Sequence, residues 1–165
     1  MSRLDSFIRR LEAQRACLNL AAKAICDLSG PVLELGLGNG RTFDHLRELL
    51  PEREIYVFDR QVAAHPDCIP DPDHLILGDI RETLPAALAR LPGPAALVHS
   101  DVGTGDQRAN AKLAAWLART LPPLLAPGAW VVADQELHDP ALRRRPAPEG
   151  IAADRYFLYV FIPTG

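Results

Sequence analysis

Apolar residues near the start of the chain recur at spacings of three, four and seven, the pattern of one face of an α-helix. The residues of this face are Leu4, Phe7, Ile8, Leu11, Leu18, Ala21, Ala22 and Ile25. The pattern ends at Ser29 and Gly30, and Pro31 starts a new element. The sequence therefore predicts a long N-terminal helix within residues 1–29.

After residue 30, short apolar runs alternate with segments of helical period. The runs predict strands over residues 32–35, 55–58, 75–77, 95–99, 129–133 and 155–162, and the helical segments cover 42–50, 83–91 and 107–121. Residues 138–154, with three prolines after Asp139, are expected to form a loop. Strands that alternate with helices predict a parallel sheet covered on both faces. We expect a single α/β domain over residues 1–165, with a doubly wound core over 30–165.

Acidic residues lie at or near the ends of five predicted strands. They are Glu34, Asp59, Asp79, Asp101 and Asp134. Ligands of open α/β sheets bind at the carboxyl ends of the strands, so this row predicts the rim of a site. Any one of these acids could equally cap the helix that follows it.

Three alternating glycines, Gly36, Gly38 and Gly40, follow the first strand and precede a helix. Free amides and a partial positive charge at a helix N-terminus favour a ligand with phosphate, carboxylate or hydroxyl oxygens. The third glycine comes one residue too early for the dinucleotide fingerprint GxGxxG, and no Gly-Lys-Ser/Thr is present. A nicotinamide oxidoreductase with an atypical loop stays open as an alternative.

The net charge of −3 gives no support to a nucleic-acid partner. No run of 18 apolar residues is present, so we expect no membrane partner. The three cysteines, Cys17, Cys26 and Cys68, form no CxxC pair and predict reduced thiols in a cytoplasmic protein.

The segment ELGLGNG, residues 34–40, resembles the first motif of class I S-adenosylmethionine (SAM)-dependent methyltransferases. Residues 56–59, 77–80 and 98–101 resemble the next three strand ends of that family, in matching order and spacing. The resemblance covers about residues 30–135 and implies a Rossmann-like fold, with a mostly parallel sheet of about six or seven strands and an antiparallel C-terminal strand. The run GLGNGRTFDHL also resembles a small bacterial group described only as SAM-dependent methyltransferases.

SAM is the cofactor that this resemblance implies. Asp59 would hold the ribose hydroxyls, which suits an acceptor with two oxygens, and Asp79 and Ile80 would flank the adenine. The full set of implied cofactor-binding residues is Glu34, Gly36, Leu37, Gly38, Asn39, Thr42, Asp59, Arg60, Gly78, Asp79, Ile80, Ser100 and Asp101.

Methyl transfer from a sulfonium is a direct displacement that requires alignment, and it needs a base only if the nucleophile must lose a proton. His99 and Asp101 share a face of the fourth strand and are the candidate catalytic residues, although His99 could instead be a buried, hydrogen-bonded residue. Asp101 with Asp134 and Gln135 resembles the metal-binding pattern of catechol-type O-methyltransferases. Gln135 replaces the asparagine of that pattern and Thr104 its lysine, so no residue is assigned to a metal.

The predicted function is methyl transfer from SAM to a small-molecule acceptor. The motif Asn-Pro-Pro-Tyr, which resembling enzymes use on amide or base nitrogens, is absent. We expect no added domain of the kind that usually shapes the acceptor pocket in this family, and a second subunit of a homo-oligomer could supply the pocket instead. The alternatives are a non-catalytic module that binds SAM and a metal-dependent catechol-type enzyme.

Overall fold

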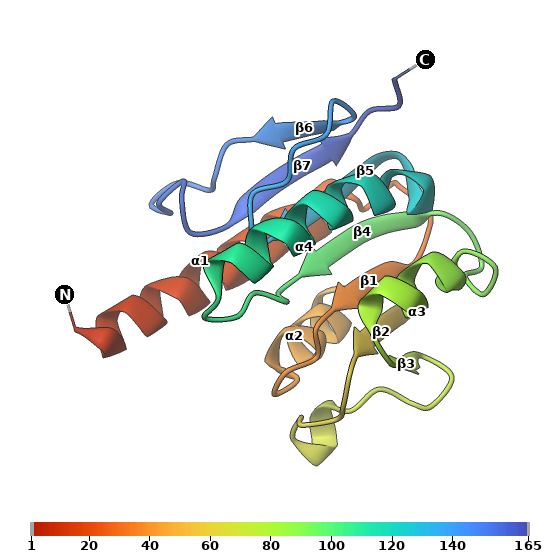
Figure 1. The fold of residues 1–165 in the computed structure, drawn as a ribbon, viewed down its shortest axis with the longest axis horizontal. Helices are drawn as coiled ribbons and strands as arrows, with labels where there is room; N and C mark the ends of the chain where they lie inside the picture. Colours follow the sequence, from red (N-terminus) through yellow and green to blue (C-terminus); the bar gives the residue numbers. More distant parts are fainter. Residues whose placement is uncertain (1, 165) are drawn as a thin grey trace.

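Seven strands form one sheet in the order β3-β2-β1-β4-β5-β7-β6 in the computed structural model, which describes residues 2–164 (Figure 1). The strands are β1 (Val32–Leu35), β2 (Ile55–Asp59), β3 (Leu75–Leu77), β4 (Ala95–Ser100), β5 (Leu125–Ala133), β6 (Leu142–Arg145) and β7 (Phe157–Phe161). β1 to β5 pair in parallel, and β7 runs antiparallel to β5 and β6. Strand order reverses between β1 and β4, which places the switch point of the sheet there.

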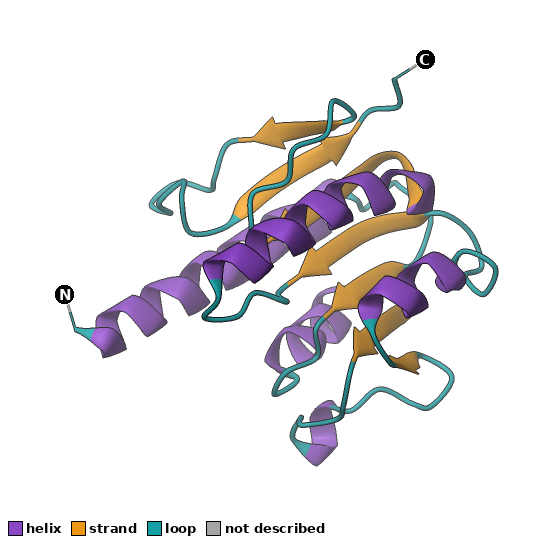
Figure 2. Ribbon diagram, in the orientation of Figure 1, coloured by secondary structure: helices purple, strands orange, loops and turns teal. Residues whose placement is uncertain are grey.

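Helices cover both faces of this sheet, so the predicted doubly wound α/β fold is confirmed (Figure 2). α1 (Arg3–Ala24) and α2 (Arg41–Leu49) lie behind the sheet in Figure 2, and α3 (Ile80–Ala87) and α4 (Gln107–Thr120) lie in front. Alternate residues of β1 enter opposite cores, because successive strand side chains point to opposite faces. Val32 joins the core under α1 and α2, whereas Leu33 and Leu35 join the core under α3 and α4.

The N-terminal helix extends beyond the sheet at its beginning (Figure 1). Ser2 and Asp5 form a capping box there, in which each side chain accepts a hydrogen bond from the other's backbone amide. The predicted apolar face is buried from Leu18 onward, but Leu4, Phe7 and Ile8 are exposed. Within residues 2–164, no helix combines the length and apolar character needed to cross a membrane.

The prediction that residues 138–154 form only a loop was wrong, because β6 lies within this segment and pairs with β7. The strand was not predicted because it consists largely of three consecutive arginines, Arg143 to Arg145, and lacks an apolar run. Their side chains are exposed at the edge of the sheet, and only Leu142 is buried. Charged residues are tolerated on an edge strand, where they discourage pairing with another chain.

Two other elements begin well before their predicted first residues. β5 begins at Leu125 instead of residue 129, because the strand continues through the exposed Pro127 and Gly128 beside an irregularity in its pairing with β4. α3 begins at Ile80 instead of residue 83, because the Asp79 side chain caps it by accepting a hydrogen bond from the Arg81 amide.

Candidate active site

The glycine loop between β1 and α2 adopts left-handed backbone angles at each of its three glycines, with φ of 94° at Gly36, 52° at Gly38 and 84° at Gly40. A Cβ at Gly36 would lie 2.6 Å from the Asp101 carbonyl oxygen, and one at Gly40 would lie 2.5 Å from the Cβ of Cys68. A Cβ at Gly38 would meet nothing within 4 Å. The first and third glycines therefore permit tight packing, and the second leaves the backbone open to a ligand.

Asp59 connects the end of β2 to this loop. Its Oδ2 accepts hydrogen bonds from the amides of Leu37 at 2.8 Å and Gly38 at 3.1 Å. Its Oδ1 accepts from the amide of Arg60 at 2.6 Å and from that of Gln61 at 3.3 Å. The carboxylate thus fixes the loop in the shape that leads into α2.

Two cavities open at the carboxyl ends of the strands. The strand-end cavity, of about 350 Å³, lies between the ends of β1 to β4 and the start of α4. The helix-side cavity, of about 160 Å³, lies between α1 and the glycine loop. The two share Gly36, Gly38 and Asp101, so within residues 2–164 Asp101 is the one charged side chain that borders both.

Most of the predicted cofactor-binding residues line these cavities. Those of the strand-end cavity are Gly36, Gly38, Asp59, Arg60, Gly78, Asp79, Ile80 and Asp101, and the helix-side cavity adds Leu37, Asn39 and Thr42. Glu34 and Ser100 line neither cavity and are at most 1% exposed. The structure therefore places these two beneath the site rather than at its surface.

Glu34 and His99 form a fully buried pair between β1 and β4. His99 Nδ1 lies 2.7 Å from Glu34 Oε2, and Thr42 donates its hydroxyl to the other carboxylate oxygen. Burial alone lowers the pKa of His99, but the Glu34 carboxylate outweighs this effect, and the net shift is upward. His99 borders neither cavity, so its side chain is not placed to take a proton from an acceptor there.

Asp101 is held from α1. Gln14 donates its Nε2 to Asp101 Oδ2 at 2.9 Å and to the Tyr156 hydroxyl at 2.6 Å, and Arg10 forms an ion pair with Asp101 Oδ1. Gln14 and Tyr156 are buried. Burial, with the negative charges of Asp101 and Asp134, raises the pKa of Tyr156, so its phenol stays protonated.

No residue of α1 was predicted to lie in the site, because the periodicity of this helix indicates a packing face. Phe7, Arg10, Leu11 and Gln14 all line the helix-side cavity. One signal was available: Gln14 lies three residues after Leu11 and four before Leu18, on the apolar face of the helix. A polar side chain in that position requires a buried partner.

Asp134 follows β5 and secures the loop after β4. Its Oδ2 accepts hydrogen bonds from the amide of Gly103 at 2.9 Å and from Gln135 Nε2 at 3.2 Å. Burial, together with the charge of Asp101, raises the pKa of Asp134. Across residues 2–164, no group of three or more histidine, cysteine, aspartate or glutamate side chains could hold a metal ion.

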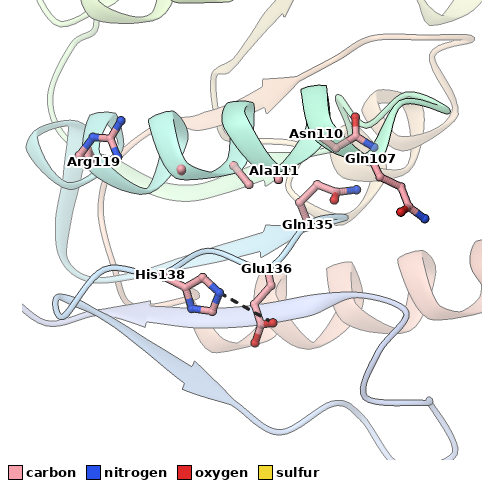
Figure 3. Close-up of a pocket in the computed structure, with 9 residues that line it drawn as sticks. Gln107, Asn110, Ala111, Arg119, Gln135, Glu136 and His138 are labelled. Atoms are coloured by element: carbon pink, nitrogen blue, oxygen red, sulfur yellow. Dashed lines mark ion pairs between the residues drawn. The ribbon is translucent and has the colours of Figure 1, made fainter.

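A wider groove, of about 660 Å³, runs along α4 (Figure 3). Gln107, Ala111 and Arg119 of α4 form one side, and Gln135, Glu136 and His138, after β5, form the other. Asn110 borders both this groove and the strand-end cavity. Its amide is held by the backbone of Thr104, with two bonds of 2.8 Å, so it forms a fixed wall between them.

A model of the family described as "S-adenosyl-L-methionine methyltransferase" matches residues 1–160. The S-adenosyl-L-methionine methyl transferase from Silicibacter pomeroyi DSS-3 is 48% identical, over 98% of this chain and 99% of that chain, with a TM-score of 0.92. A search of curated proteins gave no match.

More distant structures share the fold. Human methyltransferase-like protein 13, solved in complex with SAH (S-adenosylhomocysteine), is 14% identical over 97% of this chain and 81% of that chain, with a TM-score of 0.57. TrmN from Thermus thermophilus is 18% identical over 91% of this chain and 52% of that chain, with a TM-score of 0.56. With the family match and the relative at 48% identity, the conclusion is that this chain belongs to the S-adenosyl-L-methionine methyltransferase family and uses SAM as its cofactor.

Proposed function

We propose that the enzyme transfers the methyl group of SAM to a small-molecule acceptor beside Asp101. The observation that carries this proposal is the enclosure of Asp101: it lies where the two cavities meet, with its side chain 22% exposed beneath Arg10. Cavities of about 350 Å³ and 160 Å³ around the reacting position suit a small ligand better than a macromolecule, which needs a broad surface. The net charge of −3 also disfavours a nucleic-acid acceptor.

The residues of the strand-end cavity fit the adenosine part of the cofactor. Asp59 offers carboxylate oxygens to the ribose hydroxyls, and Asp79 and Ile80 offer an acceptor and an apolar surface to the adenine. The helix-side cavity, with the open backbone of Gly38, accepts the methionyl part. Bound SAM supplies an electrophilic methyl group, and the chain aligns the acceptor with it.

Location and assembly belong to the same proposal. The thiols of Cys17, Cys26 and Cys68 are all free, which suits the reducing cytoplasm. The exposed Leu4, Phe7 and Ile8 on the first turns of α1 suit contact with a second copy of the chain, which we expect as a homo-oligomer.

The test uses SAM carrying a tritiated methyl group. The protein is incubated with it and, separately, with the low-molecular-weight, RNA and protein fractions of a bacterial extract. Asp59→Ala, expected to bind the cofactor weakly, is the control for background labelling. The proposal predicts label in small molecules with the wild type alone. Label confined to RNA or protein would contradict it, and SAM binding without transfer to any fraction would indicate a non-catalytic binding module.

A further inference from the structure

Asp101 occupies a special position, because in the described part of the chain it is the one charged side chain that borders both cavities. In SAM the sulfur joins the adenosine part to the methionyl part. If these parts fill the strand-end and helix-side cavities, the sulfur lies at their junction. We propose that Asp101 is the counter-ion of the cofactor's sulfonium and that Gln14 is the residue that positions it. The inference rests on the cofactor placement of the proposed function.

The consequence is discrimination between the cofactor and its product. SAM carries a positive charge on sulfur, whereas SAH is a neutral thioether that keeps the adenosine and amino-acid parts. A carboxylate at the junction therefore attracts the sulfonium of SAM, whereas the neutral sulfur of SAH gives no such charge–charge attraction. Because the Asp101 side chain is only 22% exposed, water screens this attraction incompletely. Loss of the charge on methyl transfer would then weaken the hold on the product and favour its release.

Gln14 determines where the carboxylate points. A carboxylate only accepts hydrogen bonds, so the amide nitrogen of Gln14 must face it, as observed at 2.9 Å. The same nitrogen donates to the Tyr156 hydroxyl at 2.6 Å, and Gln14 and Tyr156 are only 7% and 1% exposed. This buried contact, with a residue that lines neither cavity, holds the Gln14 side chain in place. Without Gln14, the Asp101 carboxylate keeps its ion pair with Arg10 but loses the hydrogen bond that orients its second oxygen.

Arg10 opposes the proposed role of Asp101. Its guanidinium pairs with Asp101 Oδ1, is 47% exposed and also lines the helix-side cavity. Its positive charge partly neutralises the carboxylate and repels a sulfonium. Removal of Arg10 and removal of the Asp101 charge should therefore change the preference for SAM in opposite directions. A purely structural role of the ion pair would not produce opposite signs.

The experiment measures Kd for SAM and SAH by titration calorimetry at pH 7.5 and low salt, and compares the ratio Kd(SAH)/Kd(SAM) between variants. Asp101→Asn keeps the shape but removes the charge, and should lower the ratio about tenfold while the SAH affinity changes by less than about threefold. Gln14→Leu should lower the ratio less. Arg10→Gln should raise it. Asp59→Asn, at the ribose position, is the matched control and should weaken both ligands without changing the ratio.

Retained SAH binding shows that a variant is folded. The inference is overturned if Asp101→Asn weakens SAM and SAH by the same factor, or leaves both unchanged. Should Asp101→Asn lose all binding, Arg10→Gln decides: a raised ratio supports the inference and an unchanged ratio overturns it. If the wild-type protein binds neither SAM nor SAH, both the inference and the cofactor placement are overturned. If the ratios are as predicted but no methyl group reaches any acceptor, only the proposed function is overturned.

Discussion

Gly40 and Gly38 have similar backbone angles but very different surroundings. A side chain at Gly40 would overlap the Cβ and carbonyl oxygen of Cys68 as well as adopt a left-handed angle, whereas one at Gly38 meets only open space. We expect Gly40→Ala to lower the free energy of unfolding by about 2–4 kcal/mol and Gly38→Ala by about 1–2 kcal/mol. Urea denaturation without ligand measures both. If both variants lose the same free energy of unfolding, the residues around Gly40 shift to accept the added methyl group without destabilising the fold, which would contradict the prediction.

Asp59 gives a second prediction at the residue scale, because it both orders the glycine loop and borders the strand-end cavity. Asp59→Ala should weaken binding of SAM and SAH alike by about 1–3 kcal/mol, since loop amides and ligand hydroxyls lose their acceptor. Calorimetric titration checks it. Wild-type affinity in this variant would contradict the predicted contact with the ribose.

Some residues of the site were predictable from the sequence and others were not. Residues at strand ends, such as Asp59, Asp79 and Asp101, were predictable because parallel strands bring their carboxyl ends to one edge of the sheet. The burial of Glu34 was not, and that of His99 stood only as an alternative, because pairing between two strands decides whether a polar side chain finds a partner or faces a ligand.

β1 and β4 are joined by side chains as well as by their ladder, through the buried pair of Glu34 and His99. The pKa of His99 is raised in the folded state, so its stabilising contribution is complete below its unfolded pKa of about 6.5. That contribution is lost as pH rises through the folded pKa, which lies above this value.

We therefore expect the wild type to lose unfolding free energy, relative to the uncharged double variant Glu34→Gln/His99→Gln, as pH increases from 6.5 to 9. Urea denaturation at several pH values measures the difference, and the double variant subtracts the contribution of every other titrating group. A difference that stays constant across this range would mean that His99 titrates alike in the folded and unfolded chain.

Elements were predictable where their pattern was strong. The apolar runs of β1, β2 and β4, buried between two helical layers, lie close to the predicted ranges. β6 was not predicted because only Leu142 of this edge strand is buried and its three arginines are exposed, so the sequence has no alternation of apolar and polar residues there. The contact of Gln14 in α1 with Asp101 was not predictable, because only tertiary packing brings together these two residues, 87 positions apart in the chain.

At the scale of the whole molecule, α1 is both a packing element and a wall of the site. Its buried face joins the core that contains Val57 and Leu97, and Gln14 connects it to Asp101 and Tyr156. We expect residues 1–165 to unfold in one cooperative transition, and SAH at 100 times its Kd to stabilise the folded chain by about 2.7 kcal/mol. Scanning calorimetry measures both. A separate early transition, with α1 losing hydrogen-exchange protection first, would show that this helix is not part of the cooperative unit.

The position of the bound cofactor tests the account most directly, and a crystal structure of the protein with SAH would show it. The account predicts the ribose at Asp59, the adenine between Asp79 and Ile80, the sulfur beside Asp101, and the amino-acid part between α1 and the glycine loop. SAH bound elsewhere, for example in the groove along α4, or with its sulfur remote from Asp101, would contradict it.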